Sequence, residues 1–194
     1  MLSLPPLIES LLKTSLITQA ERQLISSHLN FITLKKGEHF SKAGKICDRL
    51  GILDDGLLYA NFQTEKEKLC VSRFFFHPQN IIVTSFDSFK NKTYSNETIT
   101  AITTSTLYYF NSKDLEKLTD QITGIDKVIR HLAEESYILA LQRIHDLQVL
   151  NTRERVQKFF LNNSELFNLA SKIHLASYLR VHRNDLSKFI AELE

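Results

Sequence analysis

Four successive patterns of apolar and polar positions divide the chain. Residues 6–29 place leucines and isoleucines at helical spacing, and Thr18 with Glu21 forms a capping-box signature, so a pair of helices is expected there. Residues 30–112 are short runs rich in β-branched and aromatic residues, separated by turn residues such as glycine and asparagine. Strands at a spacing of about 8–12 residues predict a small antiparallel barrel or sandwich.

The third pattern, in residues 113–150, predicts a short helix that ends near Leu118 and a long helix from about Asp120 to Leu150. The long helix carries two apolar stripes, and the second contains Tyr137, Leu141 and Ile144. At roughly 45 Å it is too long for the β-domain to enclose, so one stripe is expected to meet a second copy. We predict a homodimer seam on the first stripe, at Ile125, Ile129, Leu132, Ser136 and Leu139. The alternative is one core helix wrapped by its own fold.

The fourth pattern, in residues 151–194, begins with a second capping box at Asn151 and Glu154 and ends in two short amphipathic runs. These runs, 173–179 and 185–193, flank a basic tetrapeptide, which is the layout of a helix-turn-helix with Ala176 as the small crossing residue. The side chains expected to point outward can hydrogen-bond base edges or phosphates, and they are His182, Arg183, Asn184, Ser187 and Lys188. The pattern alone leaves open a helical hairpin with a solvated basic corner.

Composition narrows the function classes. The net charge of +2 over 194 residues gives no global field for a polyanion, so a nucleic-acid surface has to be local. Two cysteines, no signal peptide and no long apolar run indicate a reduced, cytoplasmic compartment and no membrane partner. We find no glycine-rich phosphate loop, metal-ligand spacing or nucleophile motif, so neither an enzyme nor a bound cofactor or metal is expected.

The chain resembles the Crp/Fnr family of bacterial transcription regulators from end to end. The stretch "KKGEHFSKAGKICDRLGILDDGLLYANF" is similar to the start of the family's β-roll, and "LASYLRVHRNDLSKFIAEL" is similar to its helix-turn-helix. The resemblance implies an α+β fold: an antiparallel, cupin-like β-roll with flanking helices, then a long dimerisation helix and a winged-helix-like helix-turn-helix with little or no wing. The expected domains are an effector domain at 1–118, the dimerisation helix at 119–150 and a DNA-binding domain at 151–194.

By this resemblance, the recognition helix spans about 183–193 and carries the DNA-binding residues named above, with Arg153 and Lys172 as further phosphate contacts. Arg180 stands where the family usually has glycine. An arginine there either holds a left-handed conformation, at a cost of about 1 kcal/mol, or the turn takes another shape. Glu192 and Glu194 stand where basic residues are usual, and their carboxylates would repel phosphate.

The family's cyclic-nucleotide site uses a Gly-Glu pair followed by an arginine that binds the cyclic phosphate. Here Ser95 takes the arginine's place and the Gly-Glu pair is missing, so cyclic AMP is not the expected effector. An unknown small-molecule effector would have a pocket at Phe86, Ser88, Tyr94, Ser95 and Asn96. The alternative is a solvated loop. Cys47, beside Lys45 and Arg49, is either a redox thiol or a buried small hydrophobe.

The combined expectation is a homodimeric transcription regulator that binds a pseudo-palindromic site in double-stranded DNA. The alternative is a sensory or protein-interaction β-roll with a weak or vestigial DNA-binding domain. The amino-acid sequence leaves open the effector, the operator and the choice between activation and repression.

Overall fold

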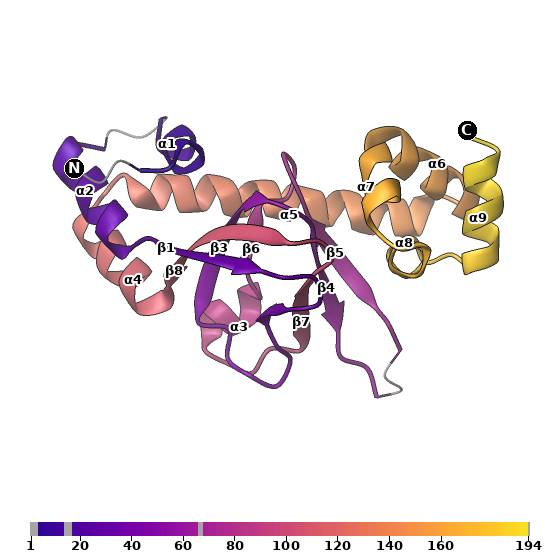
Figure 1. Cartoon of the computed structure of the whole chain (residues 1–194), viewed down its shortest axis with the longest axis horizontal. Helices are drawn as coiled ribbons and strands as arrows, with labels where there is room; N and C mark the ends of the chain where they lie inside the picture. The colour runs from indigo at the N-terminus through magenta and orange to yellow at the C-terminus, as the bar shows by residue number, and fades with distance from the viewer. Residues whose placement is uncertain (1–3, 14–16, 66–67, 194) are drawn as a thin grey trace.

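The computed structural model describes residues 4–13, 17–65 and 68–193 (Figure 1). Two helices come first, α1 (Pro6–Leu12) and α2 (Gln19–His28). The predicted capping box is confirmed, because the Thr18 hydroxyl accepts from the Glu21 amide at 3.3 Å while the Glu21 carboxylate accepts from the Thr18 amide at 2.6 Å. α2 is therefore fixed at its first turn by its own side chains.

In the described residues eight strands follow, as the β-rich pattern predicts, together with one short helix that it did not predict. They are β1 (Asn30–Leu34), β2 (His39–Ser41), β3 (Arg49–Asp55), β4 (Leu58–Phe62), β5 (Val71–Phe75), β6 (Ile82–Val83), α3 (Phe86–Asn91), β7 (Glu97–Ala101) and β8 (Ser105–Asn111). They form two antiparallel sheets with strand orders β1-β8-β3-β6 and β2-β7-β4-β5. Apolar side chains from both sheets, Leu53, Leu58, Phe75 and Ile99 among them, fill the space between the sheets. The β-roll is thus a two-sheet sandwich of the predicted class.

The conformation of the β3–β4 turn explains why residue 56 is a glycine. Gly56 has φ +104°, a region that L side chains avoid, and a Cβ built there would lie 2.3 Å from the Ser105 hydroxyl oxygen. Both the left-handed backbone and the close approach of β8 require glycine at this corner.

The remaining chain is helical: α4 (Ser112–Gln121), α5 (Ile125–Val149), α6 (Thr152–Asn162), α7 (Ser164–Leu169), α8 (Lys172–Leu179) and α9 (Arg183–Ala191). The long helix begins at Ile125, later than predicted, because α4 runs on to Gln121 and Gly124 is the N-cap of α5. α5 passes alongside the β-roll, with α1 and α2 at one end and α6 to α9 at the other (Figure 1). The fold is the predicted α+β arrangement.

Part of the predicted dimer seam packs inside the chain. Ile125 and Leu132 are 4% and 8% exposed and belong to a core cluster with α1, α2 and α4, and Ile129 packs against the same cluster. Ser136 and Leu139 are half-buried. Ile125, Ile129 and Leu132 thus bury apolar surface within the chain, whereas Ser136 and Leu139 keep part of their surface exposed. The exposed apolar side chains of α5 lie on another face, at Tyr137, Ile138, Leu141 and Ile144.

Candidate nucleic-acid interface and β-roll interior

The C-terminal helices form a helix-turn-helix. α8 and α9 are held together by buried apolar side chains, Leu175, Ala176, Leu179, Leu186 and Ile190. Between the helices, Arg180 has φ +54° and ψ +47°, and the Val181 amide donates to the Ala176 carbonyl at 3.0 Å. The turn therefore keeps the left-handed shape that usually takes glycine, with an arginine in its place.

The predicted DNA-binding residues extend along α9, from its N-cap His182 to Lys188 in its last turn. His182, Arg183, Asn184 and Lys188 are exposed. His182 is the N-cap of α9, and its Nδ1 accepts from the Asn184 amide at 3.4 Å, so this ring also has a structural role. Ser187 is half-buried and lines a hollow of about 350 Å³ with residues of α6, α7 and α8. Four of the five predicted residues thus face solvent together.

Charges around this surface are mixed. Arg153 of α6, predicted to contact phosphate, forms a 2.8 Å ion pair with Glu192 just after α9. Asp185 adds an exposed carboxylate in the first turn of α9. Glu194, the other carboxylate of the prediction, lies outside the described residues. Lys172 is exposed at the first position of α8 and borders the hollow. Local acids therefore offset part of the positive charge.

Arg155 is a positioning residue that the sequence pattern did not reveal. Its Nε donates to the Leu179 carbonyl at 2.8 Å, and its Nη1 donates to the Leu150 carbonyl at 2.8 Å. One guanidinium thereby ties the helix-turn-helix turn to the end of α5. The only sequence signal is an arginine one turn into a capped helix, which is equally typical of a solvated surface.

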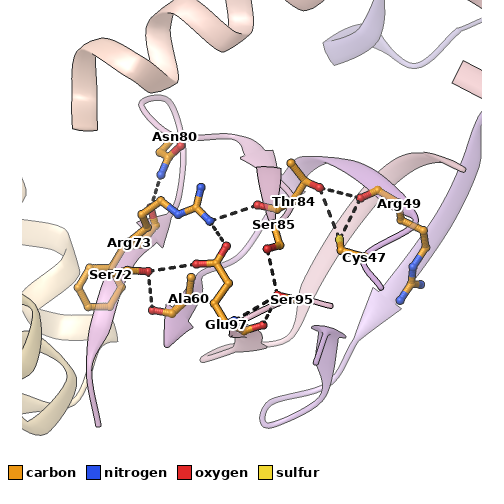
Figure 2. A network of polar contacts seen from close by, with 11 residues as sticks. Cys47, Arg49, Ala60, Ser72, Arg73, Asn80, Thr84, Ser85, Ser95 and Glu97 are labelled. Carbon is orange, nitrogen blue, oxygen red and sulfur yellow. Dashed lines mark hydrogen bonds and ion pairs between the residues drawn. The ribbon is translucent and has the colours of Figure 1, made fainter. Parts of the chain in front are cut away.

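The β-roll interior holds a polar network (Figure 2). Glu97 of β7, with a side chain 6% exposed, pairs with Arg73 of β5, whose Nη2 also donates to the Thr84 carbonyl at 3.2 Å. The Ser95 hydroxyl donates to the Glu97 carbonyl at 2.8 Å, and its oxygen lies 3.0 Å from the Ser85 hydroxyl oxygen. A buried carboxylate needs such partners to remain charged.

The predicted effector pocket is only partly assembled. Ser88 and Ser95 are buried, and Phe86 is half-buried with the Arg73 guanidinium 5.8 Å from its ring centroid. Tyr94 and Asn96 are exposed and so do not join Ser88 and Ser95 in the interior. Successive side chains of extended backbone point to opposite sides, and this alternation places Ser95 and Glu97 inside. The prediction missed Glu97, although this alternation could have identified it.

Ser88 and Cys47, near α3, have structural roles. The Ser88 hydroxyl accepts from the Cys47 amide at 2.9 Å and donates to the Thr93 carbonyl at 2.6 Å, which joins α3 to the loop before β3. Cys47 is 3% exposed, with its Sγ 3.5 Å from the Thr84 hydroxyl oxygen. This burial matches the small-hydrophobe alternative rather than an accessible redox thiol.

Sequence comparisons place the chain in no group. No family model matches it, and no curated protein matches it. Within the described part of the chain, no helix combines the length and the apolar character that a bilayer span requires, and no group of three or more metal-ligating side chains occurs there.

Solved structures do match. CLP of Xanthomonas campestris, a c-di-GMP-responsive global regulator, superimposes with a TM-score of 0.71 at 12% identity, covering 91% of each chain. A Eubacterium rectale protein assigned to the Crp/Fnr transcriptional regulators gives 0.71 at 15% identity, over 97% of this chain and 86% of that one. The chain has the Crp/Fnr fold. FixK2 of Bradyrhizobium japonicum gives 0.69 at 14% identity, over 85% and 84%. At these identities the likeness is one of fold, and function has to be argued from the site.

Proposed function

We propose that this chain is a homodimeric, DNA-binding transcription regulator of the Crp/Fnr type, without enzymatic activity. The observation that carries the proposal is α9, the second helix of the helix-turn-helix, on which His182, Arg183, Asn184 and Lys188 are exposed between the N-cap and the last turn. Arginine and lysine bind guanine edges and phosphates, and asparagine can bond adenine through both amide groups. A helix held in this way is suited to the major groove of DNA.

The exposed face of α5 supports a dimer. Tyr137, Leu141 and Ile144 follow one another at intervals of four and three residues, Ile138 lies three residues before Leu141, and the four side chains are 46–64% exposed. An apolar helical stripe of this spacing is typical of a coiled-coil seam, and a two-fold partner would bury it. Such a dimer would present two α9 helices to the half-sites of a pseudo-palindromic sequence.

The β-roll interior supports the absence of a cyclic AMP response. Ser95, at the position of the family's phosphate-binding arginine, bonds to Ser85 and Glu97, and the nearby Arg73 is paired with Glu97. A cyclic phosphate entering here would meet the Glu97 carboxylate and compete with it for Arg73. An effector of another chemistry stays open.

The test is a gel-shift experiment against genomic fragments over a range of salt concentrations. We expect sequence-selective binding whose logarithmic affinity falls linearly with log salt. Arg183→Ala should weaken base preference, and Lys188→Ala should reduce the salt slope by about one phosphate contact. Lys36→Ala, at an exposed site in the β1–β2 turn, is the matched control. Unchanged binding by both α9 variants would contradict the assignment.

Two further experiments test the dimer and the predicted absence of a cyclic AMP response. Leu141→Glu should shift the protein to monomer in analytical ultracentrifugation and weaken binding to the two-half-site duplex. Cyclic AMP should leave both the melting temperature and the affinity unchanged. The competing function, a sensory β-roll with a vestigial terminal domain, is favoured by the Arg153–Glu192 pair, which removes a cation from the surface. It would be supported if the wild-type chain showed no salt-dependent duplex binding.

A further inference from the structure

The helix-turn-helix is docked on the edge of the β-roll. The strand order β2-β7-β4-β5 leaves β5 with one open edge, and α8 packs against that edge. The Val71 amide donates to the Ser177 hydroxyl at 3.0 Å, and this hydroxyl donates to the Leu69 carbonyl at 2.9 Å. The Ser177 side chain of α8 thus pairs with backbone groups that would otherwise be left unpaired at the edge of the sheet.

Arg143 of α5 joins all three parts of the molecule. Its guanidinium carbon lies 3.7 Å from the centroid of the Tyr178 ring, and its Nη2 donates to the Tyr178 carbonyl at 2.7 Å and to the Val71 carbonyl at 3.5 Å. One side chain of the long helix therefore contacts both the edge of the β-roll and α8. A planar guanidinium can stack and donate at once, which an ammonium cannot do as well.

Apolar contacts surround this polar centre. The Tyr178 ring lies 5.1 Å from both Phe74 of β5 and Phe159 of α6, measured between ring centroids, and His174 lies 4.5 Å from Tyr59 of β4. Leu57 and Val71 of the β-roll belong to one core cluster with the buried residues of α8 and α9. This shared core gives the C-terminal helices a defined orientation on the β-roll.

α8 makes the contact with the β-roll, whereas the probe residues of α9, which are His182, Arg183, Asn184 and Lys188, remain exposed. Docking therefore orients the probe without covering it. We propose that Arg143 is a positioning residue for DNA binding. Through Tyr178 and Val71 it fixes the DNA-binding head, helices α6 to α9, on the β-roll, and so sets the separation of the two heads in a dimer. This inference rests on the proposed function.

The consequence is a preference for half-site spacing. Two fixed heads lose little conformational freedom when both half-sites bind, whereas two loose heads lose more and also tolerate altered spacing. Loss of Arg143 should therefore weaken binding to the complete site and reduce discrimination between spacings. It should leave the intrinsic affinity of one head for one half-site unchanged, because Arg143 contacts Val71 and Tyr178 between the domains and is not one of the exposed residues of α9.

The experiment uses full-length Arg143→Met and Arg143→Lys, with Ser177→Ala as an independent loosening of the same contact and Arg130→Met, an exposed arginine of α5, as control. Circular dichroism verifies that each variant is folded. Amide hydrogen exchange of Val71 reports docking, because its amide bonds to Ser177 across the contact. Duplexes with the selected spacing, with two base pairs added, and with a single half-site report positioning.

In Arg143→Met we expect Val71 exchange to accelerate by at least tenfold and affinity for the complete site to fall by about tenfold. The preference for native spacing should shrink, while half-site affinity and its salt slope stay constant. Arg143→Lys should be intermediate. Unchanged Val71 exchange, an equal loss on the half-site, or tighter binding would each overturn the inference. A wild-type chain that binds no duplex overturns the proposed function, and the Val71 exchange then still decides whether Arg143 holds the head.

Discussion

Arg73 reaches across β4 to form an ion pair with Glu97, and Ala60 is the small residue over which it passes. Ala60 is paired in register with Arg73 on one side and with Ile99 on the other, so the side chains of these three residues share one face of the sheet. Glu97 lies two residues before Ile99 and therefore points to the same face. Alanine leaves the room that the guanidinium needs to reach the carboxylate.

This ion pair predicts a strongly non-additive response to mutation. Glu97→Gln and Arg73→Met should each lower the free energy of unfolding by about 3 kcal/mol, because each strands a partly or fully buried charge. Arg73→Met/Glu97→Leu should restore most of that loss, since apolar residues of similar volume carry no desolvation cost. Urea denaturation measures all three variants. Lys158→Met, which breaks the exposed pair with Asp146, should cost less than about 1 kcal/mol. Additive costs in the Arg73/Glu97 cycle would contradict the ion pair.

The left-handed Arg180 predicts a stabilising substitution. Arg180→Gly should raise the free energy of unfolding by about 1 kcal/mol, because glycine adopts φ +54° without a Cβ clash. Arg180→Ala keeps the Cβ and should give no such gain, so it is the control. Thermal denaturation of both variants makes the comparison. Equal stabilities of Arg180→Gly and Arg180→Ala would show that the turn holds no strain of this kind.

His174 predicts a loss of stability in acid. Burial lowers the pKa of His174 below its ordinary value of 6.5, so the unfolded chain binds a proton at a higher pH than the folded chain does. The stability that the neutral ring provides is complete above about pH 6.5 and declines as the pH falls below it. His174→Phe keeps an aromatic ring against Tyr59 and should flatten this part of the pH profile in urea denaturation.

A second histidine has to be separated from this effect. Burial, followed by the nearby Lys42, also lowers the pKa of His39 of β2, so part of the acid sensitivity belongs to the β-roll. His39→Asn should remove only that part. If the profile of His174→Phe equals that of the wild type while His39→Asn flattens it fully, the His174 contact carries none of the pH dependence.

Local signals made much of the fold predictable. The capping boxes at Thr18 and Asn151 both form, because each depends on residues only three positions apart. At Arg180 the sequence left two turn shapes open, and the structure has the left-handed one. The alternating strands and the helical stripes likewise predicted the β-roll and the helix order, since each pattern reflects the period of its own element.

Contacts between distant elements were not predictable in the same way. The two stripes of α5 were evident, but which of them packs on the chain's own body depends on where α1, α2 and α4 lie, and the pattern of α5 alone carries no information about that. Arg143 and Tyr178 are 35 positions apart and meet only because α8 folds back on β5. An isolated arginine in a helix pattern gives no signal of such a partner.

The ion pair between Glu192 and Arg153 predicts that removing the Glu192 charge raises the affinity for DNA. Glu192→Gln should release Arg153 from its ion pair, so that Arg153 becomes free to bind a phosphate. In the gel-shift experiment, affinity at low salt should rise, and the slope of log affinity against log salt should steepen by about 0.9, the value for one additional phosphate contact. Glu165→Gln, at an exposed position of α7, removes the same charge from the domain without touching Arg153 and should leave the slope unchanged. In Arg153→Ala/Glu192→Gln the steeper slope should disappear. A slope that steepens equally without Arg153 would mean that Glu192 acts by long-range repulsion, and that Arg153 does not bind the phosphate.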